Sequence, residues 1–116
     1  MNREKLEAGG VDYADGLKRF ANRAPLYEKY LSKFVTEEDF SNLQAKMAQE
    51  DYEEAFKIAH ALKGVAGTLS LQPFFKEMKV LVEALRAKNG EEAQRLLPKT
   101  VEEYEKIVAV IKESEE

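Results

Sequence analysis

The chain has 116 residues, of which 44% are hydrophobic and 34% charged, and its formal net charge is −4. This length suits a single domain with a real core and leaves no room for a second catalytic domain. The negative charge argues against nucleic acid as a partner. No apolar run approaches the ~18 residues that a membrane span needs, so no membrane partner is expected either.

The cysteine and histidine content narrows the possible chemistry. The chain has no cysteine, which excludes disulfides, thiolate catalysis and cysteine metal sites. With a single histidine, a zinc or iron site would rest almost wholly on carboxylates, so we predict no metal site. The first residues lack the apolar segment of a secretion signal, which favours a cytoplasmic protein. A chain that starts at Met1 favours a free-standing protein, although an excised domain would look the same.

The N-terminal part predicts short elements. Residues 1–10 are polar and end in two glycines, so we expect a polar leader before a single domain over 11–116. Asp12 is placed to cap a short helix over 13–21, because its carboxylate can accept from the first free N–H groups.

The next segment predicts two helices in succession. Pro25 fits the first turn of a helix over 25–35, where its missing N–H costs little. The aromatic and leucine side chains of this helix are expected mostly in the core, with some forming an apolar patch that a partner could cover. Thr36, followed by three acidic residues, predicts that a further helix begins at 37.

The remaining chain continues with helical periodicity and short links. Asp51 can cap one helix, and Pro73 can open the next. We expect Pro98 to kink or break the last helix, which Thr100 and Glu103 would restart as a capping box. The longer helices are expected over 37–48, 52–69, 73–88 and 91–113. The predicted fold class is therefore all-α, an antiparallel up-and-down four-helix bundle with one or two short N-terminal helices.

The single histidine, His60, is expected to face solvent. At about 100° of rotation per residue, it falls well away from the apolar side of its helix. The same outer stripe carries Lys57, Lys63, Gly64 and Gly67. Two glycines weaken a helix by roughly 1 kcal/mol each relative to alanine. Their presence indicates that something approaches the backbone closely there, either a second helix or another protein.

This stripe can perform phosphoryl chemistry. A neutral imidazole nitrogen can attack phosphorus and hold the phosphoryl group, and Lys63, one turn later, can balance the charge on its oxygens. Lys57 could assist from the other side, although a solvated surface role is the simpler interpretation. No further acid, base or metal ligand lies nearby in sequence, so we expect no autokinase or ATPase activity.

The segment Ala59–Leu69, AHALKGVAGTL, resembles the histidine-containing phosphotransfer (HPt) family, whose pattern is His-x-x-Lys-Gly followed by small residues. The resemblance extends over about residues 10–113. It implies a phosphorelay carrier that accepts a phosphoryl group on His60 from the aspartyl phosphate of a receiver domain and exchanges it with another receiver aspartate. Lys63 would stabilise the phosphoryl charge, and Gly64 would allow docking.

The resemblance also implies partners, cofactors and further site residues. Response-regulator receiver domains and a hybrid histidine kinase would be the partners of a monomeric carrier. It would need no cofactor of its own, and Mg²⁺ would be bound by the receiver domain. The docking set comprises Gly64, Gly67, Lys57 and Gln72; a glutamine near Gln72's place lies close to the phosphoryl group in some members. Ser70 departs from the family, because many members have glycine there, which leaves the end of that helix in question.

Two further interpretations remain beside the carrier. A non-catalytic helical adaptor could keep this surface as a degenerate site and bind a signalling partner without chemistry. A carboxylate-bridged metal bundle needs Glu-x-x-His pairs on two helices. Lys57 stands where the glutamate before His60 would be, so the metal bundle is nearly excluded.

Overall fold

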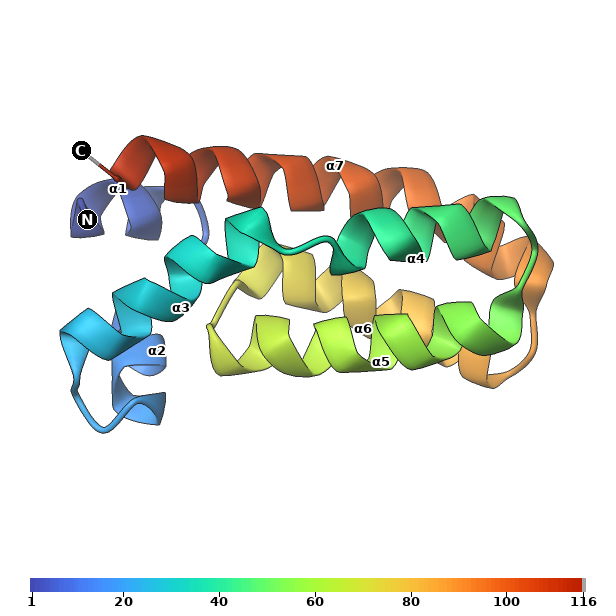
Figure 1. Cartoon of the computed structure of the whole chain (residues 1–116), viewed down its shortest axis with the longest axis horizontal. Coiled ribbons are helices and arrows are strands. Elements are labelled where there is room, and N and C mark those ends of the chain that lie inside the picture. Colours follow the sequence, from blue (N-terminus) through green and yellow to red (C-terminus); the bar gives the residue numbers. More distant parts are fainter. Residues whose placement is uncertain (116) are drawn as a thin grey trace.

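The computed structural model describes residues 1–115, which form seven α-helices joined by short links (Figure 1). Within these residues the sole extended pairing is an isolated antiparallel bridge between Val11 and Leu71. The all-α class predicted from the sequence is therefore confirmed. The helices are α1 (Arg3–Ala8), α2 (Tyr13–Arg19), α3 (Ala24–Thr36), α4 (Asp39–Ala48), α5 (Tyr52–Thr68), α6 (Gln72–Arg86) and α7 (Gly90–Ser114).

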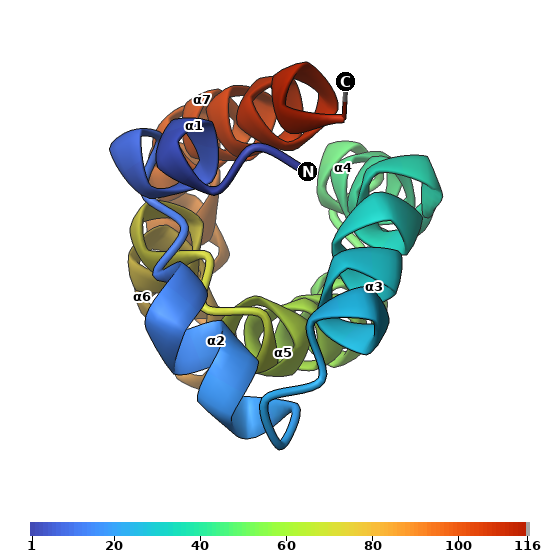
Figure 2. The same ribbon diagram turned by 90° about the vertical axis from the view of Figure 1, so that its left-hand side faces the viewer.

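The long helices form a four-column bundle. Helices α5, α6 and α7 are three of the columns, and α3 and α4 follow each other nearly end to end along the fourth (Figures 1 and 2). Helix α6 packs on both α5 and α7, while α4 packs on α5 and α3 on α7. The short links between the four columns make α4, α5, α6 and α7 antiparallel to one another in succession, as expected. The predicted four-helix bundle is thus confirmed.

Side-chain caps explain where four of the helices begin. Asn2, Asp12, Asp51 and Asn89 each accept a hydrogen bond from the backbone N–H three residues later, at 3.0, 3.1, 3.3 and 3.1 Å. Each cap satisfies an N–H that the helix leaves free, a contribution of about 1 kcal/mol. Pro25 lies in the first turn of α3. The sequence predictions for Asp12, Asp51 and Pro25 are confirmed.

The predicted helix start after Thr36 is wrong. Thr36 is the last residue of α3, and its hydroxyl donates to the carbonyl of Lys33 at 2.9 Å. Helix α4 begins at Asp39, with no side-chain cap on Glu38. A threonine hydroxyl can bond backward to its own helix as well as forward, and here the backward bond closes α3.

Of the kink or break predicted at Pro98, the break does not occur, because α7 runs through this residue without interruption. Thr100 is buried, and its hydroxyl donates to the Leu96 carbonyl at 3.2 Å instead of capping a new helix. The proline removes one helical hydrogen bond at a cost of about 3 kcal/mol. Burial on both sides of it offsets that cost. The buried residues are Ala93, Thr100, Ile107 and Ile111.

An aromatic cluster fills the centre of the bundle. Phe40 of α4 and Tyr104 of α7 are stacked with ring centroids 4.0 Å apart and an interplanar angle of 9°. Phe34 and Phe74 approach Tyr104 at 5.8 and 5.6 Å. The large rings pack against one another here, and no buried side-chain nitrogen or oxygen within residues 1–115 lacks a hydrogen-bond partner.

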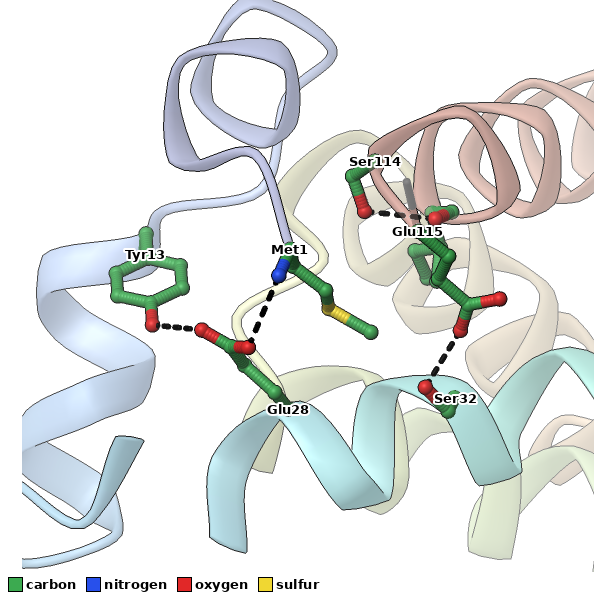
Figure 3. A network of polar contacts seen from close by, with 7 residues as sticks. Met1, Tyr13, Glu28, Ser32, Ser114 and Glu115 are labelled. Atoms are coloured by element: carbon green, nitrogen blue, oxygen red, sulfur yellow. Dashed lines mark hydrogen bonds and ion pairs between the residues drawn. The ribbon is translucent and has the colours of Figure 1, made fainter. Parts of the chain in front are cut away.

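The N-terminal helices close one end of the bundle. Leu6 of α1 is fully buried, and Glu28 of α3 accepts from the Tyr13 hydroxyl at 2.5 Å while pairing with the Met1 amine at 3.3 Å (Figure 3). Burial and the neighbouring Glu28 raise the pKa of Tyr13 to about 12. Residues 1–10, expected as a polar leader, therefore include a helix packed on α7.

Ser70 occupies the turn after α5 in a left-handed conformation, with φ at +58°. Glycine adopts this region freely, whereas a side chain costs roughly 1 kcal/mol. The buried Ser70 hydroxyl donates to Asp15 of α2 at 2.5 Å, and the Asp12 N–H donates to the Ser70 carbonyl at 2.9 Å. These bonds hold Ser70 in a conformation that glycine adopts more freely, and they attach α2 to the end of α5.

Replacing Asp15 with Asn should flatten the acid side of the stability profile. Hydrogen bonds from Ser70 and then Arg19 lower the pKa of Asp15 below its ordinary 3.8. Folding therefore favours the carboxylate, so its contribution is complete above the unfolded-state pKa and is lost as pH falls through the folded pKa. Urea unfolding from about pH 6 to about pH 2 measures this. The wild type should lose its advantage over Asp15→Asn below 3.8; a constant difference would contradict the assignment.

Candidate functional site

The site lies on the outer face of α5. The inner face of this helix carries Ala55, Ala59, Leu62 and Ala66, all buried, and small alanines let α5 sit close to its neighbours. His60 consequently points outward and is exposed, as its rotation predicted. Within residues 1–115 neither imidazole nitrogen takes part in a hydrogen bond. Both are therefore open to a group from outside.

The imidazole has one aromatic neighbour among the described residues. The ring of Phe56, one turn earlier on α5, lies 5.8 Å from the His60 ring with an interplanar angle of 33°. The guanidinium of Arg86, from α6, lies 5.2 Å from the centre of the Phe56 ring. Neither Phe56 nor Arg86 was predicted from the sequence to be part of the site. The four-residue spacing of Phe56 and His60 could have indicated the first contact, whereas Arg86 comes from another helix.

The two lysines of the predicted site have different surroundings. Lys57 forms an ion pair with Glu54 at 3.2 Å. Lys63 is half-buried and has no ion-pair partner among residues 1–115. A cation without a carboxylate partner attracts an anion more strongly than one already neutralised. Lys63 is therefore better suited to balance a phosphoryl group than Lys57.

The register of α5 and α6 indicates a third lysine beside this face. Gly67 of α5 lies against Phe75 of α6, and the two helices are antiparallel. One turn back along α5 is Lys63, and one turn forward along α6 is Lys79, so the register places these lysines opposite each other. Lys79 is exposed and also lacks an ion-pair partner in the described chain. The position of Lys79 beside Lys63 depends on the register between α5 and α6, which a single sequence does not give.

The two glycines of the stripe, Gly64 and Gly67, have different surroundings. A Cβ at Gly67 would lie 3.2 Å from the Phe75 ring, so this glycine lets α6 pack closely. A Cβ at Gly64 would meet nothing within 4 Å. The chain's own packing thus accounts for Gly67 but not for Gly64. Of the two explanations left open by the sequence, the second helix applies at Gly67.

An apolar groove of about 780 Å³ runs beside this face, between α5 and the α3–α4 column. Gly64 and Val65 form one wall, and Tyr30 stands on the other; Val65 and Tyr30 are each 41% exposed. The aromatic cluster forms the floor. The rim carries Lys33, Glu37 and Asp39. An open apolar groove of this kind is typical of a surface that a partner covers.

Gln72 lies away from the imidazole. It is the first residue of α6, it is exposed, and its N–H donates to the Gly10 carbonyl at 3.2 Å. Along the antiparallel pair it lies level with the end of α5, about 15 Å along the axis from His60 at 1.5 Å per residue. The structure does not bring Gln72 together with His60 and Lys63.

No three histidine, aspartate or glutamate side chains gather into a metal-binding group within residues 1–115. In the same part of the chain, none of the helices combines the length and apolar character needed to span a bilayer.

The helical bundle and its exposed His-x-x-Lys-Gly face define the class of helical phosphocarrier modules. A family model described as the Hpt domain matches residues 30–113, which is most of the chain. The chain therefore belongs to the Hpt domain family, and the resemblance seen in the sequence is confirmed.

Members of this family carry out histidine phosphotransfer in phosphorelay signalling. They are phosphocarriers rather than classical enzymes, and they interact with receiver domains and histidine kinases. The match begins at Tyr30, so α1 and α2 lie outside it. No curated protein and no solved structure matches the chain closely enough for comparison.

Alanine should stabilise the bundle at position 64 and be nearly neutral at 67. At Gly64 the helix-propensity gain of about 1 kcal/mol is unopposed, whereas a Cβ at Gly67 would press on Phe75. Thermal unfolding should show Gly64→Ala raising Tm by roughly 4 °C. A lowered Tm for Gly64→Ala would mean that the chain itself packs against this position, contrary to the open surface described above.

Proposed function

We propose that this chain is a phosphorelay carrier in which His60 accepts a phosphoryl group from a receiver-domain aspartyl phosphate. It then passes the group to, or takes it back from, the aspartate of another receiver domain. The observation that carries the proposal is an exposed imidazole one turn before Lys63, on a helix face that is open at Gly64; within residues 1–115 the imidazole has no hydrogen bond and Lys63 has no ion pair. Membership of the Hpt domain family supports it independently.

The transfer needs little from the carrier. A lone pair of the neutral His60 imidazole attacks phosphorus in line with the bond to the aspartate oxygen. A P–N bond forms as the P–O bond breaks, and the electron pair leaves with the aspartate carboxylate. The attacking nitrogen carries no proton in that tautomer, so no general base is required. Positioning and charge neutralisation then dominate the rate.

Lys63 supplies the charge neutralisation in this proposal. A cation about 4 Å from an anionic oxygen is worth on the order of 1 kcal/mol in water and about 4 kcal/mol near a protein surface. Lys79, opposite Lys63, adds positive potential at the same seam. Lys57, engaged by Glu54, would act at the edge of the docking surface.

The groove and Gly64 form the docking surface of the proposal. A receiver domain that covers Gly64 can approach the α5 backbone closely, and the exposed Tyr30 and Val65 offer the apolar centre that a stable interface needs. Gly67 acts here by letting α6 pack close to the docking face, and Gln72 would lie at its margin. We propose that Mg²⁺ is bound by the receiver domain, that a hybrid histidine kinase provides its phosphoryl group, and that the carrier works as a cytoplasmic monomer.

Phosphoryl transfer from a labelled receiver domain tests this function. The wild type should acquire label that is lost in acid and kept in alkali, because the P–N bond has that stability, and His60→Gln should acquire none. Label that persists on His60→Gln would assign the phosphoryl group to another residue. A wild type that binds the receiver but acquires no label would favour the non-catalytic adaptor.

Removing the positive charge at position 63 should slow transfer without unfolding the bundle. Lys63→Ala should reduce the transfer rate by about 5- to 50-fold, which corresponds to roughly 1–2.3 kcal/mol of lost stabilisation. Rapid-quench kinetics with the labelled receiver measures the rate. The matched control is Lys112→Ala, an exposed lysine near the end of α7. Equal rates for both variants would remove Lys63 from the mechanism.

A bulky side chain at position 64 should block docking. Gly64→Gln places its side chain over open surface, so the fold should persist while receiver binding weakens at least tenfold. Titration calorimetry measures the affinity, and circular dichroism confirms the fold. A Gly64→Gln variant that binds and transfers normally would show that the receiver does not approach this face.

A further inference from the structure

Phosphoryl transfer requires the imidazole ring to have a defined orientation. An exposed histidine side chain does not hold one orientation by itself. In-line attack needs the nitrogen aimed at phosphorus, and misalignment costs rate. A helical histidine has about two favoured χ1 wells and two ring orientations, or about four states. No hydrogen bond within residues 1–115 selects among these states for His60.

We propose that Phe56 is the residue that positions the His60 ring, an inference that rests on the proposed function. Its ring centroid lies 5.8 Å from the imidazole at an interplanar angle of 33°, within the range of favourable aromatic pairs. Among the described residues it is the sole ring in contact with His60. The pair lies at positions i and i+4 of one helix, so the contact is built into α5.

Phe56 can position another ring because it is itself held. It is half-buried and packs against the core. The guanidinium of Arg86 lies 5.2 Å from its centre, a cation–π distance, and Arg86 is in turn bonded to Glu83 at 3.4 Å. The imidazole is therefore connected through Phe56 to both α5 and α6, although it has no hydrogen bond or ion pair within the described part of the chain.

The size of the effect follows from the number of states removed. If Phe56 selects one of about four orientations, releasing the ring lowers the productive fraction by up to about fourfold. Phe56→Leu keeps an apolar side chain at the site but removes the planar ring. It should slow transfer about two- to fourfold at saturating receiver, with an unchanged half-saturating receiver concentration. Phe56→Tyr keeps the ring and should transfer like the wild type.

The experiment combines NMR and kinetics on the whole chain. Three-bond couplings of the single histidine report its χ1 populations. In the wild type they should show one dominant rotamer, and in Phe56→Leu an average over several. The matched control is Ile58→Ala, which removes another half-buried apolar side chain of α5 and should leave the His60 couplings unchanged. Transfer rates for all four proteins are measured with the same labelled receiver.

The outcomes separate this inference from the proposed function. Averaged couplings with a slower rate in Phe56→Leu, both restored in Phe56→Tyr, support it. Unchanged couplings in Phe56→Leu overturn it, and so do averaged couplings with an unchanged rate. If the wild type acquires no label from any receiver, the proposed function fails and this inference fails with it. Label on the wild type and equally fast label on Phe56→Leu overturn this inference alone.

Discussion

The burial of one narrow stripe of small residues on α5 determines the geometry of the site. Ala55, Ala59 and Ala66 are fully buried between the neighbouring helices, so burial of this apolar side sets the rotation of α5. Once the rotation is fixed, His60 must lie in solvent, with Lys63 at the edge of the core. The exposure of the imidazole thus follows from packing on the opposite side of its helix.

The outer face of α5 is less stable than it could be. Glycine at position 64 destabilises the helix by about 1 kcal/mol relative to alanine, and no packing contact among the described residues requires a glycine there. Gly67, by contrast, lies against α6, where an added Cβ would come within 3.2 Å of the Phe75 ring. The same face keeps an apolar groove open beside it. Gly64 therefore departs from helix propensity without a packing contact in residues 1–115 that explains it.

Local signals allowed much of this fold to be predicted from the sequence. Caps at Asp12 and Asp51 and the period of the apolar residues act within a few positions, so they gave the helices and the outward rotation of His60 correctly. The predictions of a helix start at Thr36 and of a break at Pro98 were wrong because contacts beyond the local signal decided the structure there. Their local tendencies favour a cap and a break, but a backward hydrogen bond and burial along α7 decided the outcome.

The candidate site likewise has residues that local spacing predicts and residues that only the packing of two helices brings in. The residues on α5 itself, His60 and Lys63, follow from helical spacing in one segment. Arg86 and Lys79 depend on the register between α5 and α6, which only the packed structure supplies. Ser70 shows a related limit, because its left-handed conformation is sustained by Asp15, a residue 55 positions earlier in the chain.

The central claim is that the outward-facing nitrogen of a single side chain carries the phosphoryl group. The most direct measurement is NMR of the chain labelled with ¹⁵N-histidine and phosphorylated by a receiver domain. Because the chain has one histidine, a ¹⁵N–³¹P coupling can arise only at His60. The account predicts that coupling on one imidazole nitrogen. A protein-bound phosphorus signal without coupling to histidine nitrogen would contradict it.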